Sequence, residues 1–305
     1  MPPTDKKHPR PGETEAHARS RGRAEKREQR ENATSPPEEI LTGPERDRVA
    51  ENGRLSALTV YSIILREGQE ELERPATSLW WSGIAAGIGI STSVLAVAIL
   101  RVNLGEDHPY LSAIGSLGYT FGFVLVILSR LQLFTENTIT VILPLLAQIS
   151  RHRLICTARL WGVVLVANLA GTFLTAAIAV HANVLTPDIL DAVFAISRHL
   201  AELSPLEALL RGIPAGFFIA ALVWMLPSAR GTEVFVIVMF TWLIAAGEFT
   251  HVIAGSNEIF VLVLAGEMGL LTALSLHIAP VLVGNILGGT GLFAVLAYGQ
   301  IRNEM

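Results

Sequence analysis

Two polar inserts, SRLQLFTENT (129–138) and GEFTHVIAGSNE (247–258), interrupt apolar stretches of the chain and decide the fold. The first insert lies within an apolar run from about residue 111 to residue 149, and the second lies within a run from 232 to 264. Each run is longer than the roughly 20 residues that one helix needs to cross a bilayer. The sequence therefore predicts two membrane crossings that are broken by loops.

The rest of the chain has the composition of a membrane protein. Of its 305 residues, 51% are hydrophobic and only 16% are charged, whereas soluble domains carry about 25% charged residues. Further apolar runs fall at about 78–100, 155–182, 206–226 and 273–299. Together with the two interrupted runs, they predict an all-α polytopic membrane protein with six transmembrane spans in the lipid bilayer.

The broken spans are the second and the fifth, which are the middle members of two successive groups of three. Because three is an odd number, the two three-helix halves have inverted orientations. Interrupted helices at corresponding positions of two inverted halves indicate a transport site at the membrane midplane. Irregular backbone at that depth has to be buried in protein or line a cavity. We therefore predict a transport domain over residues 78–305.

The first 77 residues have a different composition from the spans. Residues 1–46 are highly charged and lack aromatic side chains, which indicates a disordered tail. Apolar residues then recur at three- and four-residue steps from Val49 to Leu65, which predicts an amphipathic helix over residues 47–77 that lies along the membrane or on the next protomer. Most Lys and Arg residues lie in the tail, at 151–159 and after the other even-numbered spans, so the positive-inside rule predicts cytoplasmic termini.

Several functional classes are disfavoured. The basic residues of the tail alternate with Glu and form no basic stripe, which argues against nucleic-acid binding. A single cysteine, Cys156, excludes a disulfide framework and a Cys-rich metal site. We predict no cofactor, no metal and no enzymatic activity. A metal site at His251 and Glu248 or a serine nucleophile at Ser256 would lack further partners at suitable spacing.

Both inserts contain ionisable residues of a kind that membrane spans usually exclude. These are Arg130 and Glu136 in the first insert, and Glu248, His251 and Glu258 in the second. A charged group at the centre of a span costs about 2.5–3.5 kcal/mol on insertion scales, so such groups pair with one another or face a pathway. Arg130 and Glu136 therefore either neutralise each other or face the pathway.

Two features of the inserts are suited to the passage of a solute. An unperturbed histidine titrates near pH 6.5, so His251 can exchange a proton with the anion of a weak acid. Leu133 and Phe134 precede Thr135 and would form an apolar constriction beside a hydroxyl group.

Four stretches occur in the same order as the loop and span motifs of the formate/nitrite transporter family. They are LQLFTENT (131–138), RLWGVVLVANLAG (159–171), GEFTHVIAGSNEIF (247–260) and GNILGG (284–289). The chain resembles this family over roughly residues 75–300, and especially its bacterial inner-membrane branch with a long charged N-terminal tail. The resemblance implies an aquaporin-like fold and a homopentamer with one pore per protomer. Family members move small monovalent anions, often together with a proton.

The resemblance also implies which residues line the pore. The central histidine of the family falls on His251, its loop threonine on Thr135, and its constriction residues on Leu133 and Phe134. Asn137 falls in the polar pair after that threonine, and the further pore positions are Tyr119 and Phe123.

Four positions depart from the family pattern. Arg130 replaces a usual Gly, Glu136 a small residue and Gly255 an amide, while Glu248 adds a carboxylate three residues before His251. Such a carboxylate should repel a naked anion unless Arg130 offsets its charge, and it should stabilise the protonated histidine.

The sequence thus predicts a channel or proton-coupled transporter for small monovalent anions, with His251 as a proton donor in the pore. It leaves two alternatives open, namely a pore for a small neutral solute and a membrane scaffold or sensor whose pore is closed.

Overall fold

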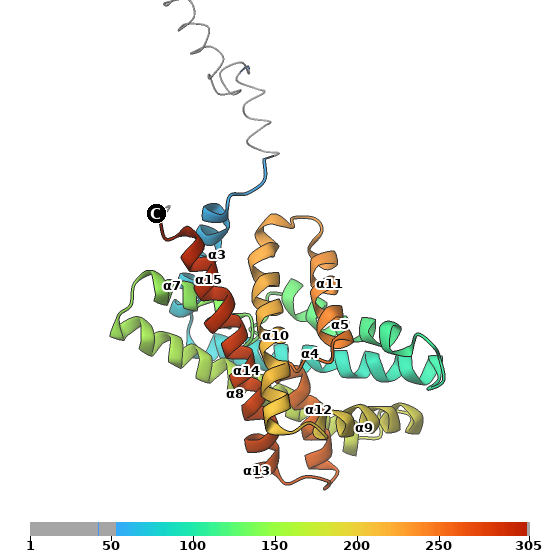
Figure 1. Ribbon diagram of the computed structural model, residues 1–305. Helices are drawn as coiled ribbons and strands as arrows, with labels where there is room; N and C mark the ends of the chain where they lie inside the picture. Colours follow the sequence, from blue (N-terminus) through green and yellow to red (C-terminus); the bar gives the residue numbers. More distant parts are fainter. Residues whose placement is uncertain (1–41, 43–52, 304–305) are drawn as a thin grey trace, which may run out of the picture. The chain divides into compact units, whose positions relative to one another are not determined.

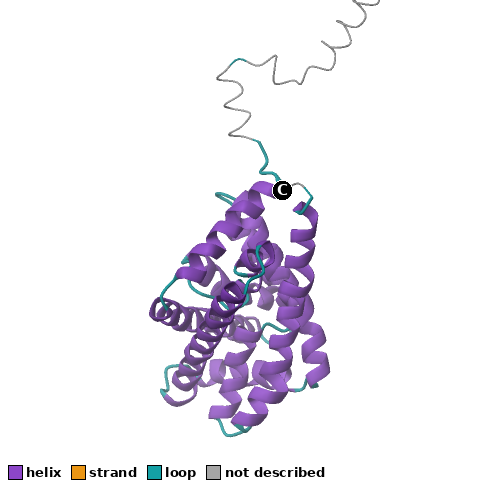
Figure 2. Ribbon diagram, turned by 90° about the vertical axis from the view of Figure 1, so that its left-hand side faces the viewer, coloured by secondary structure: helices purple, strands orange, loops and turns teal. Residues whose placement is uncertain are grey.

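The computed structural model describes residue 42 and residues 53–303. The predicted tail, apart from residue 42, and the first part of the predicted amphipathic helix (47–52) lie outside the described residues. The described residues form helices joined by loops (Figure 2). The helices are α3 (Ala57–Glu73), α4 (Ala76–Leu104), α5 (Leu111–Leu128), α6 (Asn137–Thr140), α7 (Ile142–Ala147), α8 (Arg151–His181), α9 (Pro187–Ala201), α10 (Pro205–Met225), α11 (Glu233–Ala246), α12 (Val252–Leu264), α13 (Leu270–Thr272), α14 (Ala279–Ile286) and α15 (Val295–Ile301).

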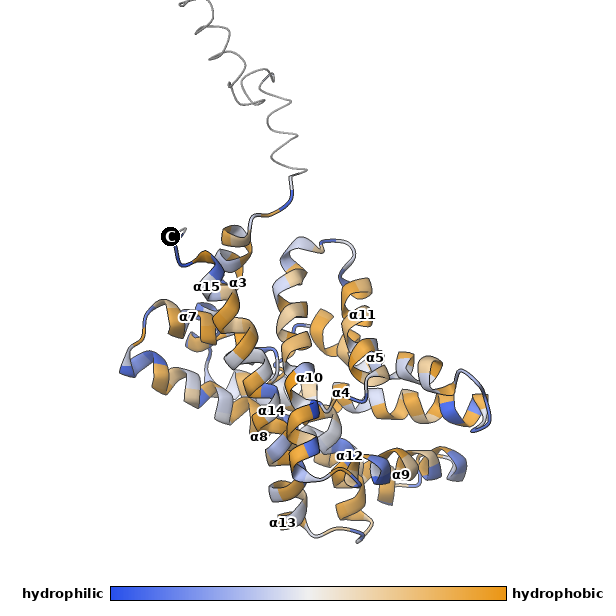
Figure 3. Ribbon diagram, viewed as in Figure 1, coloured by the Kyte–Doolittle hydropathy of each residue, from blue (hydrophilic) through white to orange (hydrophobic). Residues whose placement is uncertain are grey.

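Within the described residues, five helices are long and apolar enough to cross a membrane. They are α4, α5, α8, α10 with its short extension to Ser228, and the run Leu270–Ile301. That last run joins α13, α14 and α15 through two π-helical segments, Ala273–Ile278 and Leu287–Ala294. Hydrophobic residues dominate these helices, and hydrophilic ones gather mainly at their ends (Figure 3). The prediction of an all-α polytopic membrane protein is confirmed.

The two halves of the domain repeat one arrangement. In the first half α4 packs between α5 and α8, and in the second half α10 packs between α11 and α14. The halves meet where α5 contacts α11 and where α12 contacts α8 and α9 (Figure 1). The broken elements are α5 with α6 and α7 in the first half, and α11 with α12 in the second. Both interruptions are therefore where the sequence predicts them.

The second interruption is shorter than the sequence analysis predicts. Helix α11 ends at Ala246, and α12 already begins at Val252 with His251 as its N-cap. Glu258 consequently lies inside α12 and not in the loop. Because α12 has 13 residues and α11 has 14, neither is long enough to cross a bilayer alone.

Helix α3 packs on its own protomer. Ser56 caps the helix by accepting a hydrogen bond from the backbone N–H of Thr59 at 3.1 Å. Its apolar face is buried, with Tyr61 2% and Ile64 0% exposed. That face contacts α7, α10 and α15 of the same chain. The position of α3 relative to the membrane or to a neighbouring protomer stays a prediction.

Outside the spans, α9 is tied to the loop that follows α12. The guanidinium of Arg198 donates a hydrogen bond of 2.9 Å to the carboxylate of Glu267. This contact stabilises the ionised carboxylate and lowers the pKa of Glu267. Helix α9 also packs directly against α12.

Candidate functional site

The two interruptions begin with the same backbone turn. At the end of α5 the N–H of Leu131 donates to the carbonyl of Val126 at 3.0 Å, and at the end of α11 the N–H of Phe249 donates to the carbonyl of Ile244 at 2.9 Å. Such bonds are those of a Schellman motif, which satisfies the last carbonyls of a helix and turns the chain away from its axis. The position before each donor has left-handed backbone.

Non-glycine residues occupy both left-handed positions. The φ angle is 53° at Arg130 and 52° at Glu248, where a side chain costs roughly 1–2 kcal/mol. Both side chains point to ion pairs at the protein surface: Arg130 with Glu67 of α3 at 3.1 Å, and Glu248 with Arg211 of α10 at 2.8 Å.

This strain gives a first testable prediction. Arg130→Gly and Arg130→Ala remove the same ion pair, but only glycine adopts the left-handed conformation without steric cost. The glycine variant should therefore be more stable than the alanine variant by about 1 kcal/mol. Thermal unfolding of the two purified variants in detergent measures the difference, and equal melting temperatures would contradict the prediction.

A buried asparagine holds the chain after each turn. In the first half, Asn168 of α8 is fully buried. Its Nδ2 donates to the carbonyl oxygens of Gly83 and Gln132, both at 2.8 Å. Its Oδ1 accepts a hydrogen bond from the backbone N–H of Phe134 at 2.9 Å. One side chain thus satisfies two backbone groups of the interruption and joins them to α4.

The second half repeats this contact with Asn285 of α14. Its Nδ2 donates to the carbonyl oxygens of Gly212 at 2.8 Å and Thr250 at 2.9 Å. Its Oδ1 accepts a hydrogen bond from the backbone N–H of Val252 at 2.8 Å. We call this three-bond arrangement in each half the asparagine clamp. Because unpaired amides in hydrocarbon cost several kcal/mol each, the clamps explain how irregular backbone persists inside the domain.

Glycine residues in the spans allow the helices to approach closely enough for these bonds. A Cβ atom at Gly216 of α10 would collide with the backbone carbonyl oxygen of Asn285, and one at Gly87 of α4 would collide with that of Asn168. The equivalent residues of the two halves therefore have the same packing role.

The two interruptions meet at one side-chain contact. Thr135 Oγ1 of the first lies 2.7 Å from His251 Nε2 of the second. Both residues are buried, with Thr135 0% and His251 2% exposed. The Nδ1 atom of His251 accepts a hydrogen bond from the N–H of Ala254 at 3.3 Å. A neutral imidazole that accepts at Nδ1 carries its proton on Nε2. His251 therefore donates to Thr135, and the hydroxyl proton of Thr135 is free to be donated elsewhere.

Aromatic side chains surround this contact. The ring of Phe123 lies edge-on to that of His251, with 4.9 Å between centroids, and the ring of Tyr119 lies 5.2 Å from Phe123. Phe134 packs against Trp161 of α8 at 5.5 Å. The imidazole therefore has an apolar ring on one side and the hydroxyl of Thr135 on another.

Two cavities border the residues of the two interruptions. The first, which we call the first vestibule, has a volume of about 390 Å³ and lies between α3, the first interruption and the loop from α10 to α11. Leu133 is among its lining residues. Its charged lining residues are Glu67, Glu71, Arg130, Glu136, Arg230 and Glu233.

The second vestibule is larger, at about 700 Å³. His251 lines it together with Tyr119, Gly255 and Glu258. The lining residues of the two vestibules do not overlap. Leu133 lines the first vestibule, His251 lines the second, and Thr135 contacts His251. We call these three residues, which link the two linings, the closed segment.

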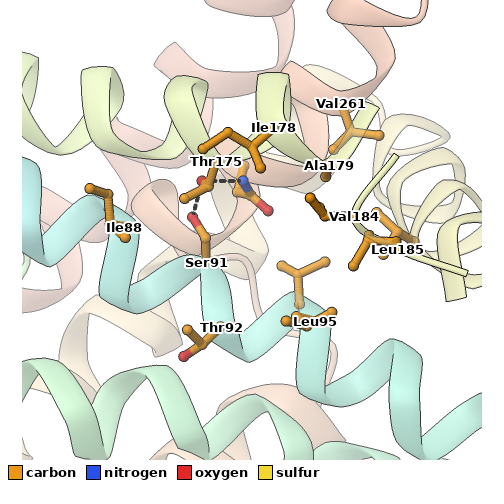
Figure 4. A pocket seen from close by; sticks show the side chains of 13 residues that line it. Ile88, Ser91, Thr92, Leu95, Thr175, Ile178, Ala179, Val184, Leu185 and Val261 are labelled. Carbon is orange, nitrogen blue, oxygen red and sulfur yellow. Dashed lines mark hydrogen bonds between the residues drawn. The ribbon is translucent and has the colours of Figure 1, made fainter. Parts of the chain in front are cut away.

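A third cavity, of about 200 Å³, lies apart from this segment among α4, α8, α9 and α12. Its walls are mostly aliphatic (Figure 4). Within it Thr175 donates a hydrogen bond of 2.7 Å to Ser91 and accepts one of 3.0 Å from Asn257. These polar side chains satisfy one another, so the cavity offers little to hold a polar solute.

The structure excludes one of the two alternatives for Arg130 and Glu136 and corrects the expected role of Glu248. Arg130 pairs with Glu67 and not with Glu136, while Glu136 Oε1 is buried and has no hydrogen-bond partner among the described residues. Glu248 pairs with Arg211, so its charge is engaged away from His251 and does not stabilise a protonated imidazole there. Both outcomes have the same cause. The long side chains of Arg130 and Glu248 turn toward partners in distant segments of the chain.

The remaining predicted site residues have different surroundings. Thr135 contacts His251, and Leu133 lies two residues before Thr135. Asn137 lines the first vestibule and also braces the first interruption, because its Nδ2 donates to the carbonyl of Leu133 at 3.2 Å. Phe134 and Phe123 are packed side chains and line neither vestibule, while Tyr119 lines the second one.

The two clamp asparagines are functional residues that the sequence analysis did not single out. A signal was present, because Asn168 and Asn285 are amides in apolar spans and each is followed three residues later by glycine, in NLAG and NILG. Polar residues inside spans indicate pairing or function.

The fold and site define an all-helical membrane protein in which two clamped interruptions meet between two cavities. Residues 58–299 match the family model described as formate/nitrite transporter, and the chain belongs to that family. Its relatives are thus transport proteins, which favours transport over enzymatic activity.

Three similarities illustrate the relationship. The chain is 40% identical over 249 residues to the inner membrane protein YfdC of Escherichia coli, an alignment that covers 82% of this chain and 80% of YfdC. It is 25% identical over 236 residues to the formate channel FocA of Haemophilus influenzae, covering 73% and 79% of the two chains. The structure of a pentameric formate channel with formate bound superposes with a TM-score of 0.64 at 22% identity, covering 75% of this chain and 98% of that one.

Proposed function

We propose that this protein conducts the anions of small weak acids across the membrane and that His251 protonates them in the pore. The contact between Thr135 and His251 carries the proposal, because it places a hydroxyl and an imidazole at the closed segment between two cavities. The family assignment and the formate channels among the similar proteins support this class of solute.

The geometry suggests how a proton would reach the anion. His251, once protonated at Nδ1 from the second vestibule, loses its weak 3.3 Å contact with the N–H of Ala254. Its Nε2 proton then passes to Thr135 Oγ1, 2.7 Å away, while the hydroxyl proton of Thr135 passes to the anion. The imidazole becomes neutral, the threonine is restored, and a neutral acid is formed. The acid crosses the apolar surface of Leu133 far more easily than an unpaired ion does.

Assembly and orientation complete the proposal. Helices α11 and α12 together would form the fifth of six crossings. The protein would lie in a bacterial inner membrane with both termini in the cytoplasm. The domain exposes large apolar side chains, such as Trp81 at 70% and Phe235 at 71%, which require lipid or a neighbouring protomer. We expect a homopentamer, and the native mass of the solubilised complex tests that number.

Uptake by proteoliposomes tests the function directly. With an inward proton gradient, the protein should accelerate the uptake of formate, nitrite, hydrosulfide, acetate or lactate, and uptake should rise as the external pH falls because more imidazole is protonated. Protein-free liposomes correct for direct permeation of the acids. Acceleration of none of these anions at any pH would contradict the proposal.

A pore for neutral solutes is the second candidate, because acidic side chains outnumber arginines in the lining of the first vestibule. Osmotic shrinkage and reswelling of the same proteoliposomes with glycerol or urea separates the two functions. Fast reswelling without anion uptake would favour the neutral solute.

A further inference from the structure

Glu258 faces the same cavity as His251. The residues His251, Gly255 and Glu258 follow at steps of four and three along the start of α12, so they share one helix face. All three line the second vestibule. The intervening Gly255 has no side chain, so α12 places nothing between the imidazole and the carboxyl group on that face. Seven residues of helix separate the two groups by about 10 Å along the axis.

The carboxyl group of Glu258 has no partner among the residues that the structure describes. Glu258 is only 8% exposed. Its carboxyl group forms neither a hydrogen bond nor an ion pair with any described residue. The other charged or titratable residues that line this vestibule, besides His251 and Tyr119, are Arg101, Glu106, His108, His199, Arg211 and Glu248.

The cations of this cavity are engaged elsewhere. Arg101 pairs with Glu106 at 3.2 Å, and Arg211 pairs with Glu248 at 2.8 Å. The ring of His199 lies 3.7 Å from the carboxylate of Glu202 and 4.0 Å from that of Glu248. His108 accepts a hydrogen bond from the backbone N–H of Tyr110 at 3.2 Å. Glu258 therefore has no arginine of its own.

A buried carboxylate without a counter-charge is costly, so such a group takes up a proton or a cation. When it is ionised, its charge also repels anions that approach His251. The cavity volume of about 700 Å³ is ample for several water molecules, each of which occupies roughly 30 Å³ in the liquid. Water can thus bridge the gap between the two side chains along the open face of Gly255.

We propose that Glu258 is a specificity-determining and proton-transfer residue of the pore, an inference that rests on the function proposed above. The O–H bond of its carboxylic acid breaks as an N–H bond forms at Nδ1 of His251, with the proton carried by vestibule water. The carboxylate regains a proton from the solvent at the mouth of the vestibule. Anions of weak acids pass because they accept this proton, whereas anions of strong acids remain charged and are repelled.

Paired flux measurements test this role. Proteoliposomes that contain an internal pH indicator are given an inward proton gradient with either formate or chloride, and both solute uptake and internal acidification are recorded. Glu258→Gln keeps the size and hydrogen-bonding capacity of the side chain but cannot exchange its proton. We expect formate uptake and the accompanying acidification to fall about tenfold or more. Chloride entry should increase because the repelling charge is lost.

Two further variants make the result specific. Glu258→Asp keeps an acid and should retain coupled formate uptake and low chloride entry. Glu202→Gln makes the same substitution at an exposed residue outside the vestibule lining and should behave like the wild type. Unchanged formate uptake and chloride entry in Glu258→Gln would overturn the inference, as would an Asp variant as impaired as the Gln variant.

The design separates the two levels of the proposal. A wild-type protein that moves no formate and no protons would overturn the proposed function and this inference together. A wild-type protein with proton-coupled formate uptake, combined with an unaffected Glu258→Gln variant, would overturn only the role of Glu258.

Discussion

Replacing His251 with asparagine will remove the pH dependence of anion uptake in proteoliposomes and will lower uptake at acidic pH by about 100-fold. The variant lacks a side chain that can take up and release a proton, so it cannot pass a proton to Thr135, which lies 2.7 Å from Nε2 in the native protein. The anion would then have to cross the apolar segment in its charged form, which is strongly unfavourable.

Asparagine is a suitable replacement because of where the residue lies. His251 is the N-cap of α12 and accepts a hydrogen bond from the N–H of Ala254. Asparagine is among the preferred N-cap residues, so the helix start should persist. A His251→Phe variant removes both the proton and the cap. Thr135→Ser keeps the hydroxyl and should retain most of the uptake, and a His251→Asn variant with native pH dependence would contradict the mechanism.

Replacing either clamp asparagine with leucine will destabilise the protein by about 2–6 kcal/mol. Each substitution leaves one carbonyl oxygen and one N–H of the interruption without a partner, and it removes a further hydrogen bond to a helix carbonyl. An unsatisfied buried group costs about 1–3 kcal/mol, and the two losses occur together. Leucine has a similar volume, so the effect comes from the lost hydrogen bonds and not from a cavity.

The loss should appear as a lower melting temperature and a smaller yield of monodisperse protein after extraction with detergent. Asn103→Leu is the matched control, because Asn103 is exposed near the end of α4 and bonds only to the carbonyl of Ile99 in its own helix. That control should change stability by less than about 0.5 kcal/mol. Variants of Asn168 or Asn285 as stable as the control would show that the clamps do not hold the interruptions.

The interrupted crossings were predictable because they depend on local properties. An apolar run that is too long for one span and contains polar residues such as Thr135 and Glu136 cannot be one continuous membrane helix, whatever surrounds it. The meeting of the two interruptions also follows, since inverted halves bring their middle members together, whereas the pore roles of Thr135 and His251 rest on the family resemblance. The class of fold and the contact between the interruptions were therefore predictable from the sequence.

The partners of the charged side chains could not be predicted from the sequence. Arg130 pairs with Glu67, 63 residues earlier in the chain, although Glu136 is much nearer in sequence. Its left-handed backbone at the end of α5 sends the side chain toward α3. Sequence spacing carries no information about that direction. The place of α3 itself depends on grooves formed by α7, α10 and α15, which exist only in the folded domain.

Different side chains follow the clamped carbonyl groups in the two halves. Leu133 follows Gln132 in the first clamp, and His251 follows Thr250 in the second. Although the two halves of the scaffold repeat one arrangement, the proposed pathway between them is asymmetric along its length. On the proposed mechanism, a solute that enters through the second vestibule reaches the proton donor His251 before it reaches Leu133. A solute that enters through the first vestibule reaches Leu133 before His251. Influx and efflux should accordingly respond unequally to the same change of pH, so the protein would act as a rectifier.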